Sequence, residues 1–186
     1  MKKSLFGIVA LVAALLCVLS AQEQESADTA ETPDKVVKKG GEKSAKLNPV
    51  AKALSELEVF NGEVDAKAKF YIYLDSASWC GPCKAEMPTI VKEYPKMKKK
   101  KVEIVLIGAD KSPEAAQKYL KDFGAKFPGV WRMAPGVKDL PGYPSPRSFP
   151  HATFVNAKGQ VLQEGHGSII EQWAEIIKRK PEKQKK

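Results

Sequence analysis

Two cysteines separated by two residues are the side chains with the clearest chemistry in this chain of 186 residues. Cys80 and Cys83 lie in the hexapeptide Trp-Cys-Gly-Pro-Cys-Lys, and the third cysteine, Cys17, is distant in sequence. In a helix this spacing places the two sulfurs one turn apart, close enough to form a disulfide. The pair is therefore a redox-active dithiol, a structural disulfide or half of a zinc site.

The sequence around the two cysteines favours redox chemistry. Residues 70–74 form an apolar, aromatic run that predicts a buried strand, and the motif opens a helix that is expected to reach about Tyr94, with a kink at Pro88. Unpaired N–H groups and the positive end of the dipole stabilise a thiolate at a helix N-terminus. We therefore expect Cys80, on the solvent side, to attack a disulfide and Cys83 to resolve the mixed disulfide.

Metal binding is the alternative use of the same sulfurs. A zinc site needs two more ligands, and the histidines, His151 and His166, match no common zinc spacing. His151 reads as a surface residue that could tune Cys80 from the rim of the site, and His166, between two glycines, reads as part of a turn. A Cu(I) delivery module is the second hypothesis, because soft thiolates suit Cu(I), although no Met-rich or His-rich patch lies near the motif.

The remaining elements must place the cysteine pair on a sheet. Asn48-Pro49 predicts a helix start, with Leu54, Leu57 and Phe60 facing the core. Further predictions are a strand over 102–107, a helix from Ser112 to Gly124, a proline-rich loop over 135–150, a hairpin with strands 152–155 and 160–163, and a helix from Ser168 to about Lys178 that opens with the capping box Ser168-x-x-Glu171. This order predicts an α/β sandwich with a mixed sheet.

Both ends of the chain are predicted to lie outside this domain. Two lysines, a short apolar run and then Ser20-Ala21 are typical of a secretory signal peptide over residues 1–21, and an uncleaved signal anchor is the alternative. Lipid attachment at Cys17 is disfavoured by the preceding Leu16. We divide the chain into this signal peptide, a polar, disordered linker over 22–47, a domain over 48–180 and a basic tail over 181–186.

The positive charge is weak evidence for any partner. Removal of the signal peptide lowers the formal charge from +9 to +7 and leaves two cysteines. The lysines of 96–101 and 178–186 suit solvated helix ends, and no aromatic residues alternate with them as in many nucleic-acid binders. We therefore expect no nucleic-acid partner, with an anionic envelope surface as a weak partner at most.

The motif resembles a known family. Trp79–Lys84 is similar to the active-site motif of thioredoxins, and Cys83–Pro88 resembles the Cys-x-x-Glu-x-Pro of the TlpA/ResA-like branch of exported thiol:disulfide oxidoreductases. The resemblance covers roughly residues 49–180. It implies a thioredoxin-like sandwich, in which helices flank a central mixed β-sheet and a helix-containing insertion, about residues 110–148, precedes a cis-proline.

The resemblance also implies which residues meet the substrate. Pro150 takes the place of the family's cis-proline, and the backbone of Phe149 would pair with the substrate chain near the dithiol. Trp79 would shield the edge of the site, and Pro82 would stiffen the link between the sulfurs. Both residues, together with Gly81, are expected to meet the substrate.

A proton acceptor for the dithiol is less clearly indicated. Glu86 lies three residues after Cys83 on the same helix face and is the candidate that the resemblance favours. The family often has a buried aspartate six residues before the first cysteine, where this chain has Leu74. Asp75, one residue later, would point to the other face of the strand unless the strand bulges. Glu86, Asp75 and water therefore stay open as acceptors.

The resemblance implies that the redox reaction needs no metal or organic cofactor, since the Cys80–Cys83 disulfide is itself the redox group. Expected partners are protein disulfides and dithiols, with a membrane electron donor as a further candidate and a monomer as the assembly. The Gly-Pro dipeptide resembles reducing thioredoxins and favours a reductase in the periplasm or cell envelope. Cytochrome c maturation, rescue of oxidised envelope proteins and general disulfide exchange all stay open as its task.

Overall fold

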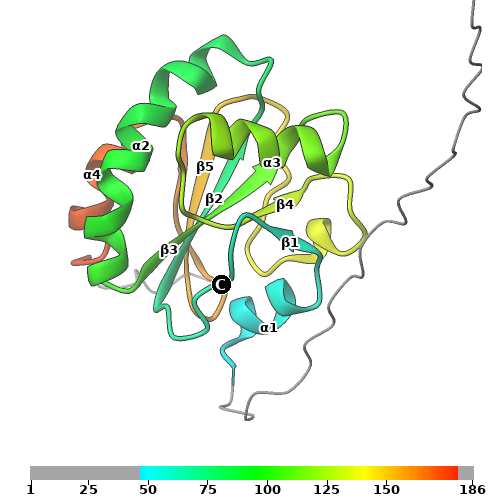
Figure 1. The fold of residues 1–186 in the computed structure, drawn as a ribbon. Coiled ribbons are helices and arrows are strands. Elements are labelled where there is room, and N and C mark those ends of the chain that lie inside the picture. The colour runs from blue at the N-terminus through cyan, green and yellow to red at the C-terminus, as the bar shows by residue number, and fades with distance from the viewer. Residues whose placement is uncertain (1–46, 180–186) are drawn as a thin grey trace, which may run out of the picture. The chain divides into compact units, whose positions relative to one another are not determined.

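The computed structural model describes residues 47–179, which form a six-stranded sheet in the order β1-β4-β3-β2-β5-β6 (Figure 1). The strands are β1 (Val59–Phe60), β2 (Phe70–Ser76), β3 (Val102–Gly108), β4 (Gly129–Trp131), β5 (His151–Asn156) and β6 (Val161–Gly165). The helices are α1 (Pro49–Ser55), α2 (Gly81–Lys99), α3 (Pro113–Asp122) and α4 (Ser168–Ile176), with a single 3-10 turn η1 (Val137–Asp139). The predicted signal peptide, nearly all of the linker and the basic tail lie outside the described residues.

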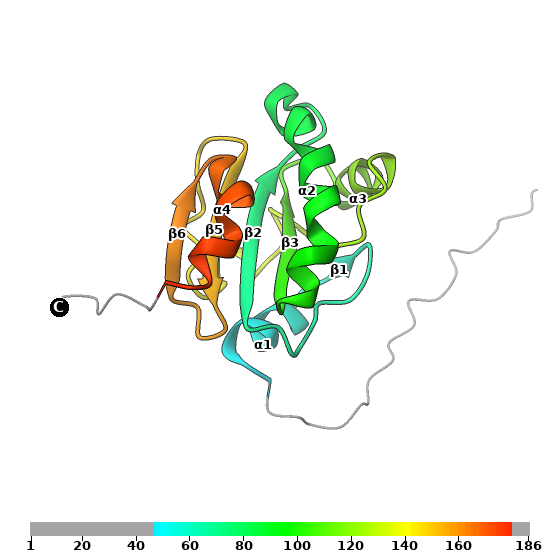
Figure 2. The same cartoon turned by 90° about the vertical axis from the view of Figure 1, so that its left-hand side faces the viewer.

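The sheet is mixed, as predicted. β2 pairs in parallel with β3, and β3 with β4, whereas the β1–β4, β2–β5 and β5–β6 pairs are antiparallel. α2 connects β2 to β3, and α3 connects β3 to β4, so both connections move toward the same edge of the sheet. Because crossovers between parallel strands are right-handed, both helices lie on the same face of the sheet. α4 lies beside α2 on that face (Figure 2).

The residues of β2 alternate between two apolar clusters. Ile72 and Leu74 pack with α2, α3 and α4, whereas Tyr71 and Tyr73 pack with α1 and η1 on the other face. Because side chains alternate along a strand, the next residue, Asp75, shares the face of Tyr73. This alternation decides which groups reach the dithiol.

The helix that follows the cysteines is longer than predicted. It continues past Tyr94 to Lys99 and contains both Pro88 and Pro95. A stripe of buried side chains runs along its whole length and includes Met97, in the last turn. Both prolines lie on the exposed side, where the carbonyls left without an N–H partner can bind water. Burial of the stripe therefore outweighs the two interruptions.

Three predicted helix caps agree with the structure. The side chain of Asn48 accepts a hydrogen bond from the N–H of Ala51 at 2.9 Å, and that of Ser112 accepts one from the N–H of Ala115 at 3.3 Å. Gly124 follows α3 with φ of +65°, a conformation that suits glycine after a helix end.

Two other helix predictions are wrong. α4 has Gly167 as its N-cap residue, and the Ser168 hydroxyl donates to the carbonyl of His166 instead of capping the helix, so the expected capping box with Glu171 does not form. α1 ends at Ser55, and Phe60 belongs to strand β1 rather than to the helix, although its ring still packs on the core.

The short strands β1 and β4 were not predicted. They contain two and three residues, too few for a periodic signal. Their pairing depends on a close approach, because a Cβ on Gly129 would lie 2.4 Å from the ring of Phe60. The predicted insertion thus contributes a strand as well as its helix.

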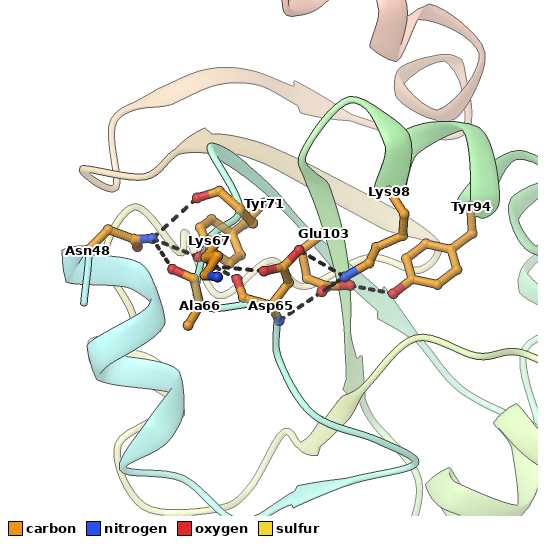
Figure 3. Close-up of polar contacts among 9 residues, drawn as sticks. Asn48, Asp65, Ala66, Lys67, Tyr71, Tyr94, Lys98 and Glu103 are labelled. Atoms are coloured by element: carbon orange, nitrogen blue, oxygen red, sulfur yellow. Dashed lines mark hydrogen bonds and ion pairs between the residues drawn. The ribbon is translucent and has the colours of Figure 1, made fainter. Parts of the chain in front are cut away.

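A buried polar network lies at the end of α2 opposite the cysteines (Figure 3). Glu103 of β3 is fully buried and accepts hydrogen bonds from the Lys98 ammonium at 2.7 Å, the Tyr94 hydroxyl at 2.6 Å and the backbone N–H of Asp65 at 2.9 Å. The network joins the last turns of α2 to the loop that leads into β2. Since β2 and α2 carry the site, this network fixes their relative position from the far end.

Replacing Glu103 by Gln is expected to lower the free energy of unfolding by about 1 to 3 kcal/mol, because the amide removes the buried counter-charge of the Lys98 ammonium and leaves it only the partly exposed carboxylate of Asp65 at 3.2 Å. Urea unfolding followed by circular dichroism measures the change. Asp122→Asn, which removes an exposed partner of Lys118, is the control and should leave the midpoint unchanged. Equal effects of the two substitutions would contradict the assigned role of the network.

Candidate active site

The two cysteines lie where β2 passes into α2. Cys80 is the N-cap residue of α2, Pro82 occupies the first turn and Cys83 lies one turn into the helix. The two are joined by a disulfide with a Cα–Cα distance of 5.2 Å. The backbone N–H of Cys83 donates to Sγ of Cys80 at 3.3 Å. The N-terminal position predicted for the motif is thus confirmed, and the first sulfur already accepts a helix N–H.

Burial distinguishes the two sulfurs only slightly. Cys80 is 6% exposed and Cys83 is 1% exposed, so the expected order holds but Cys80 is less open to solvent than predicted. Ala77, Ala109 and Phe149 pack against the pair. The Cys80 sulfur is therefore bordered closely by these neighbours and does not lie in a wide opening.

Trp79 forms the exposed part of that rim. It is 61% exposed, donates from Nε1 to the carbonyl of Ala109 at 3.2 Å and meets the ring of Phe149 edge to face at a centroid distance of 5.6 Å. Phe149 precedes Pro150, and the peptide bond between them is cis, as predicted. The structure thus brings Trp79, Phe149 and the cysteines into one cluster, while Gly81 lies exposed at the start of α2.

Asp110, which the sequence analysis did not consider, fixes the loop before Cys80. Its carboxylate accepts from the N–H of Ser78 at 3.1 Å and from the Ser78 hydroxyl at 2.5 Å. Its carbonyl accepts from Nε1 of Trp131 at 3.0 Å. The signal in the sequence was an aspartate two residues after a buried strand, near the edge at which the parallel strands β2 and β3 end.

Asp75 occupies the face of the sheet that strand alternation predicts. It is fully buried, and its Oδ1 accepts from the Tyr143 hydroxyl at 2.5 Å and from Nη1 of Arg132 at 2.9 Å. Burial raises the pKa of Asp75 from 3.8 to about 7, against the opposing effects of Tyr143 and Arg132. Its hydrogen bonds therefore join it to the segment after β4, on the side away from α2.

Glu86 lies half-buried between α2 and the start of α4. The backbone of Gly167 passes close to the Glu86 carboxylate, since a Cβ on Gly167 would lie 2.6 Å from Oε1. Glu86 and Glu171 line the same hollow. Burial raises the pKa of Glu86, and the like charge of Glu171 adds to the rise, while His166 opposes it. Proton transfer between Glu86 and Cys83 stays a prediction.

The histidines lie next to the cis-proline. Nδ1 of His166 is within hydrogen-bond distance of the carbonyl of Pro150, and its ring meets that of His151 edge to face at 5.9 Å. Burial lowers the pKa of His151. His166, expected only to form a turn, thus links the start of α4 to the proline loop.

No group of three or more His, Cys, Asp or Glu side chains that could hold a metal ion occurs among residues 47–179. None of the helices in that range combines the length and apolar character needed to cross a bilayer. Copper binding by the two sulfurs stays an untested alternative.

A dithiol at a strand-to-helix junction, facing a cis-proline on a mixed sheet, defines thioredoxin-fold proteins. Residues 68–141 match a family model described as thioredoxin-like, in agreement with the thioredoxin-like fold of the described residues. The fold agrees with a thiol:disulfide interchange protein from Bacteroides sp., with a TM-score of 0.52, 20% identity and coverage of 63% of this chain and 79% of that one. A thioredoxin family protein from Chlorobium tepidum TLS gives a TM-score of 0.51 at 22% identity, covering 60% and 79%.

Relatives in sequence are proteins named thiol-disulfide oxidoreductase ResA. The protein from Bacillus thuringiensis subsp. konkukian is 35% identical over 104 residues, which are 55% of this chain and 58% of that protein. The protein from Halalkalibacterium halodurans is 27% identical over 142 residues, covering 76% and 77%. The chain thus spans little more than half the length of the first of these relatives.

The raised pKa of Asp75 makes stability depend on pH. Between 3.8 and about 7 the native carboxyl holds a proton that the unfolded chain releases, so this group lowers the free energy of unfolding as pH rises through that window. Asp75→Asn cannot titrate. Urea unfolding from about pH 4 to about pH 8 should therefore show the wild type losing stability relative to the variant as pH rises. A difference that is constant with pH would contradict this.

Proposed function

We propose that the protein is an exported thiol:disulfide oxidoreductase that reduces protein disulfides through Cys80 and Cys83. The observation that carries the proposal is the position of Cys80 as N-cap residue of α2, beside the edge formed by Phe149 and cis-Pro150. The helix N–H groups stabilise a thiolate there, and the neighbouring edge offers backbone groups to a substrate. The names of the sequence relatives support the same activity.

The reaction starts from the reduced dithiol. The Cys80 thiolate attacks one sulfur of the substrate disulfide, the S–S bond of the substrate breaks and the other substrate sulfur leaves as a thiolate that takes up a proton. Cys83 then loses its proton and attacks Sγ of Cys80, which releases the second substrate thiol and forms the Cys80–Cys83 disulfide. Two electrons pass to the substrate, and a separate dithiol donor, for which a membrane protein is the candidate, must reduce the protein again.

Substrate positioning falls to the residues around the first sulfur. The β2–β5 ladder begins at His151, so Phe149 lies just beyond the paired residues, where its backbone can pair with an extended substrate chain. The exposed ring of Trp79 offers an apolar wall beside it. Gly81 and Pro82 are exposed between the sulfurs, where the absence of a side chain at Gly81 leaves room for the partner.

Glu86 is proposed as the proton acceptor for Cys83. The two residues are three apart on α2, and the raised pKa of Glu86 brings the carboxylate closer to the range in which a general base works at neutral pH. Asp75 is a weaker candidate, because its hydrogen bonds go to Arg132 and Tyr143 on the other face of the sheet. Water can supply the remaining link between the carboxylate and the thiol.

Export and direction rest on sequence features. The N-terminal basic and apolar residues support export to the periplasm or cell envelope, either free or held by an uncleaved anchor. The Gly-Pro dipeptide between the cysteines supports reduction over oxidation. Reduction of an apocytochrome disulfide in cytochrome c maturation is one task that such a protein could serve.

Substitution of the two cysteines separates their roles. Cys80→Ser should abolish reduction of insulin disulfides by dithiothreitol through this protein, because the thiol that remains, Cys83, is only 1% exposed and does not reach a protein disulfide. Cys83→Ser should form the mixed disulfide with a substrate protein but not release it, and the adduct should appear on a non-reducing gel and disappear after added reductant. Insulin reduction that survives in Cys80→Ser would refute the proposed function.

Removal of the Glu86 charge tests its role as base. Glu86→Gln should slow the release of substrate from a preformed mixed disulfide by about ten- to hundredfold near neutral pH, and the loss should shrink at alkaline pH as Cys83 ionises without help. Stopped-flow fluorescence of Trp79 can follow this single turnover. Glu171→Gln, on the other wall of the same hollow, is the matched control and should leave the rate nearly unchanged. Equal effects would show that charge in the hollow, not a base, matters.

A further inference from the structure

Arg132 connects the buried carboxylate of Asp75 to the residue that precedes the cis-proline. Arg132 directly follows β4, and its backbone N–H donates to the carbonyl of Gly108 at 2.9 Å, which fixes where the side chain starts. Nη1 donates to Oδ1 of Asp75 at 2.9 Å, and Nη2 donates to the carbonyl of Pro146. The guanidinium carbon lies 5.0 Å from the ring centroid of Phe149.

Asp75 holds the same segment of chain at two points. Besides Arg132, its Oδ1 binds the hydroxyl of Tyr143, whose ring meets Tyr73 edge to face at 5.6 Å. Its second oxygen, Oδ2, is buried without a hydrogen-bond partner among the described residues. One carboxylate on the sheet thus anchors both Arg132 and Tyr143, and through them the stretch that leads to Phe149.

Phe149 is confined on two sides. The rings of Trp79 and Phe149 meet edge to face, the guanidinium of Arg132 lies over the Phe149 ring, and Phe149 packs against the cluster that contains both cysteines. A guanidinium over an aromatic face is attractive, and the attraction grows where water is excluded. The Arg132 side chain is only 18% exposed. The position of Phe149 next to the sulfurs therefore depends on a side chain whose own position depends on Asp75.

We propose that Arg132 is a positioning residue: paired with Asp75, it holds Phe149 where its backbone meets an extended substrate chain. The proposal rests on the proposed function, because it concerns substrate docking at the same dithiol. Arg132 touches neither sulfur by a hydrogen bond, so its removal should weaken the docking of polypeptide substrates and leave the reactivity of Cys80 intact. A small disulfide that needs no backbone pairing should not sense the change.

The pairing also couples docking to pH. The groups that face Asp75 are the guanidinium of Arg132 and the hydroxyl of Tyr143, with His151 opposite it on the neighbouring strand. The Asp75 carboxylate binds the guanidinium more strongly when it is ionised. A proton on Asp75 weakens that pair, and the raised pKa of Asp75 places this change near neutral pH. The KM for a polypeptide substrate should therefore rise as the pH falls through neutrality.

Two disulfide substrates distinguish docking from chemistry. For Arg132→Met the KM for insulin, with dithiothreitol as the recycling reductant, should rise about tenfold while kcat changes less than about twofold. The rate at which the reduced protein cleaves dithiobis(2-nitrobenzoate) should stay unchanged, which also shows that the variant folds. Arg132→Lys keeps the positive charge but loses the planar contact with the Phe149 ring. Its KM for insulin should therefore lie between those of the wild type and Arg132→Met. Arg147→Met, an exposed arginine of the same segment, is the control and should match the wild type.

The pH dependence of the KM for insulin is a second measurement, and it should not change if Asp75 and Arg132 only stabilise the fold. In the wild type the KM for insulin should rise between about pH 8 and about pH 6, whereas Asp75→Asn should give a high KM with little dependence on pH. An unchanged insulin KM in Arg132→Met, or equal losses with insulin and dithiobis(2-nitrobenzoate), would overturn the positioning role. Failure of the proposed function looks different, because then the wild type itself would not reduce insulin.

Discussion

The site depends on the junction at which a buried central strand passes through a short turn into a helix. β2 is the central strand that pairs with both β3 and β5, so its end cannot shift without breaking two ladders. α2 begins within five residues of that end and buries a stripe of side chains along its whole length. Cys80 is therefore held at the one point where unpaired helix N–H groups converge on a sulfur, and its reactivity follows from the backbone around it.

Buried carboxylates hold this junction from both ends. Glu103 ties the last turns of α2 to the loop before β2, where it neutralises the Lys98 ammonium. At the other end Asp110 fixes the loop that precedes Cys80. Each of these side chains accepts more than one hydrogen bond, which offsets the cost of burying an acid. The donors to Glu103 come from α2 and the loop before β2, and both donors to Asp110 belong to Ser78. The sheet thus carries a rigid site on a turn that has no regular structure of its own.

Local patterns predicted most of the fold, and contacts distant in sequence account for most of what was missed. The strand before Cys80, the caps Asn48 and Ser112 and the cis bond at Pro150 all follow from neighbouring residues or from a family motif. β1 and β4 are too short to show a period, and they form because Gly129 lets the ring of Phe60 approach. The capping box failed because α4 begins one residue earlier than the box requires, with Gly167 as N-cap and Ser168 already inside the helix. In the site, the contacts of Asp110 and Arg132 span about 30 and 57 residues, a separation that no local pattern records.

Strand alternation finally explains why two acids near the dithiol take different roles. The side chain of Leu74 faces α2, so an acid at this position would lie on the side of the sheet that carries the cysteines. The side chain of the next residue, Asp75, points to the other face and contacts the segment after β4. The carboxylate that is best buried is therefore directed at the substrate-facing loop, through Arg132, and not at Cys83. The acid on the α2 side of the sheet is Glu86, supplied by the helix itself and kept half-buried by Gly167. In the proposed mechanism, a one-residue displacement along a strand thus separates proton transfer, assigned to Glu86, from substrate positioning, assigned to Asp75 through Arg132.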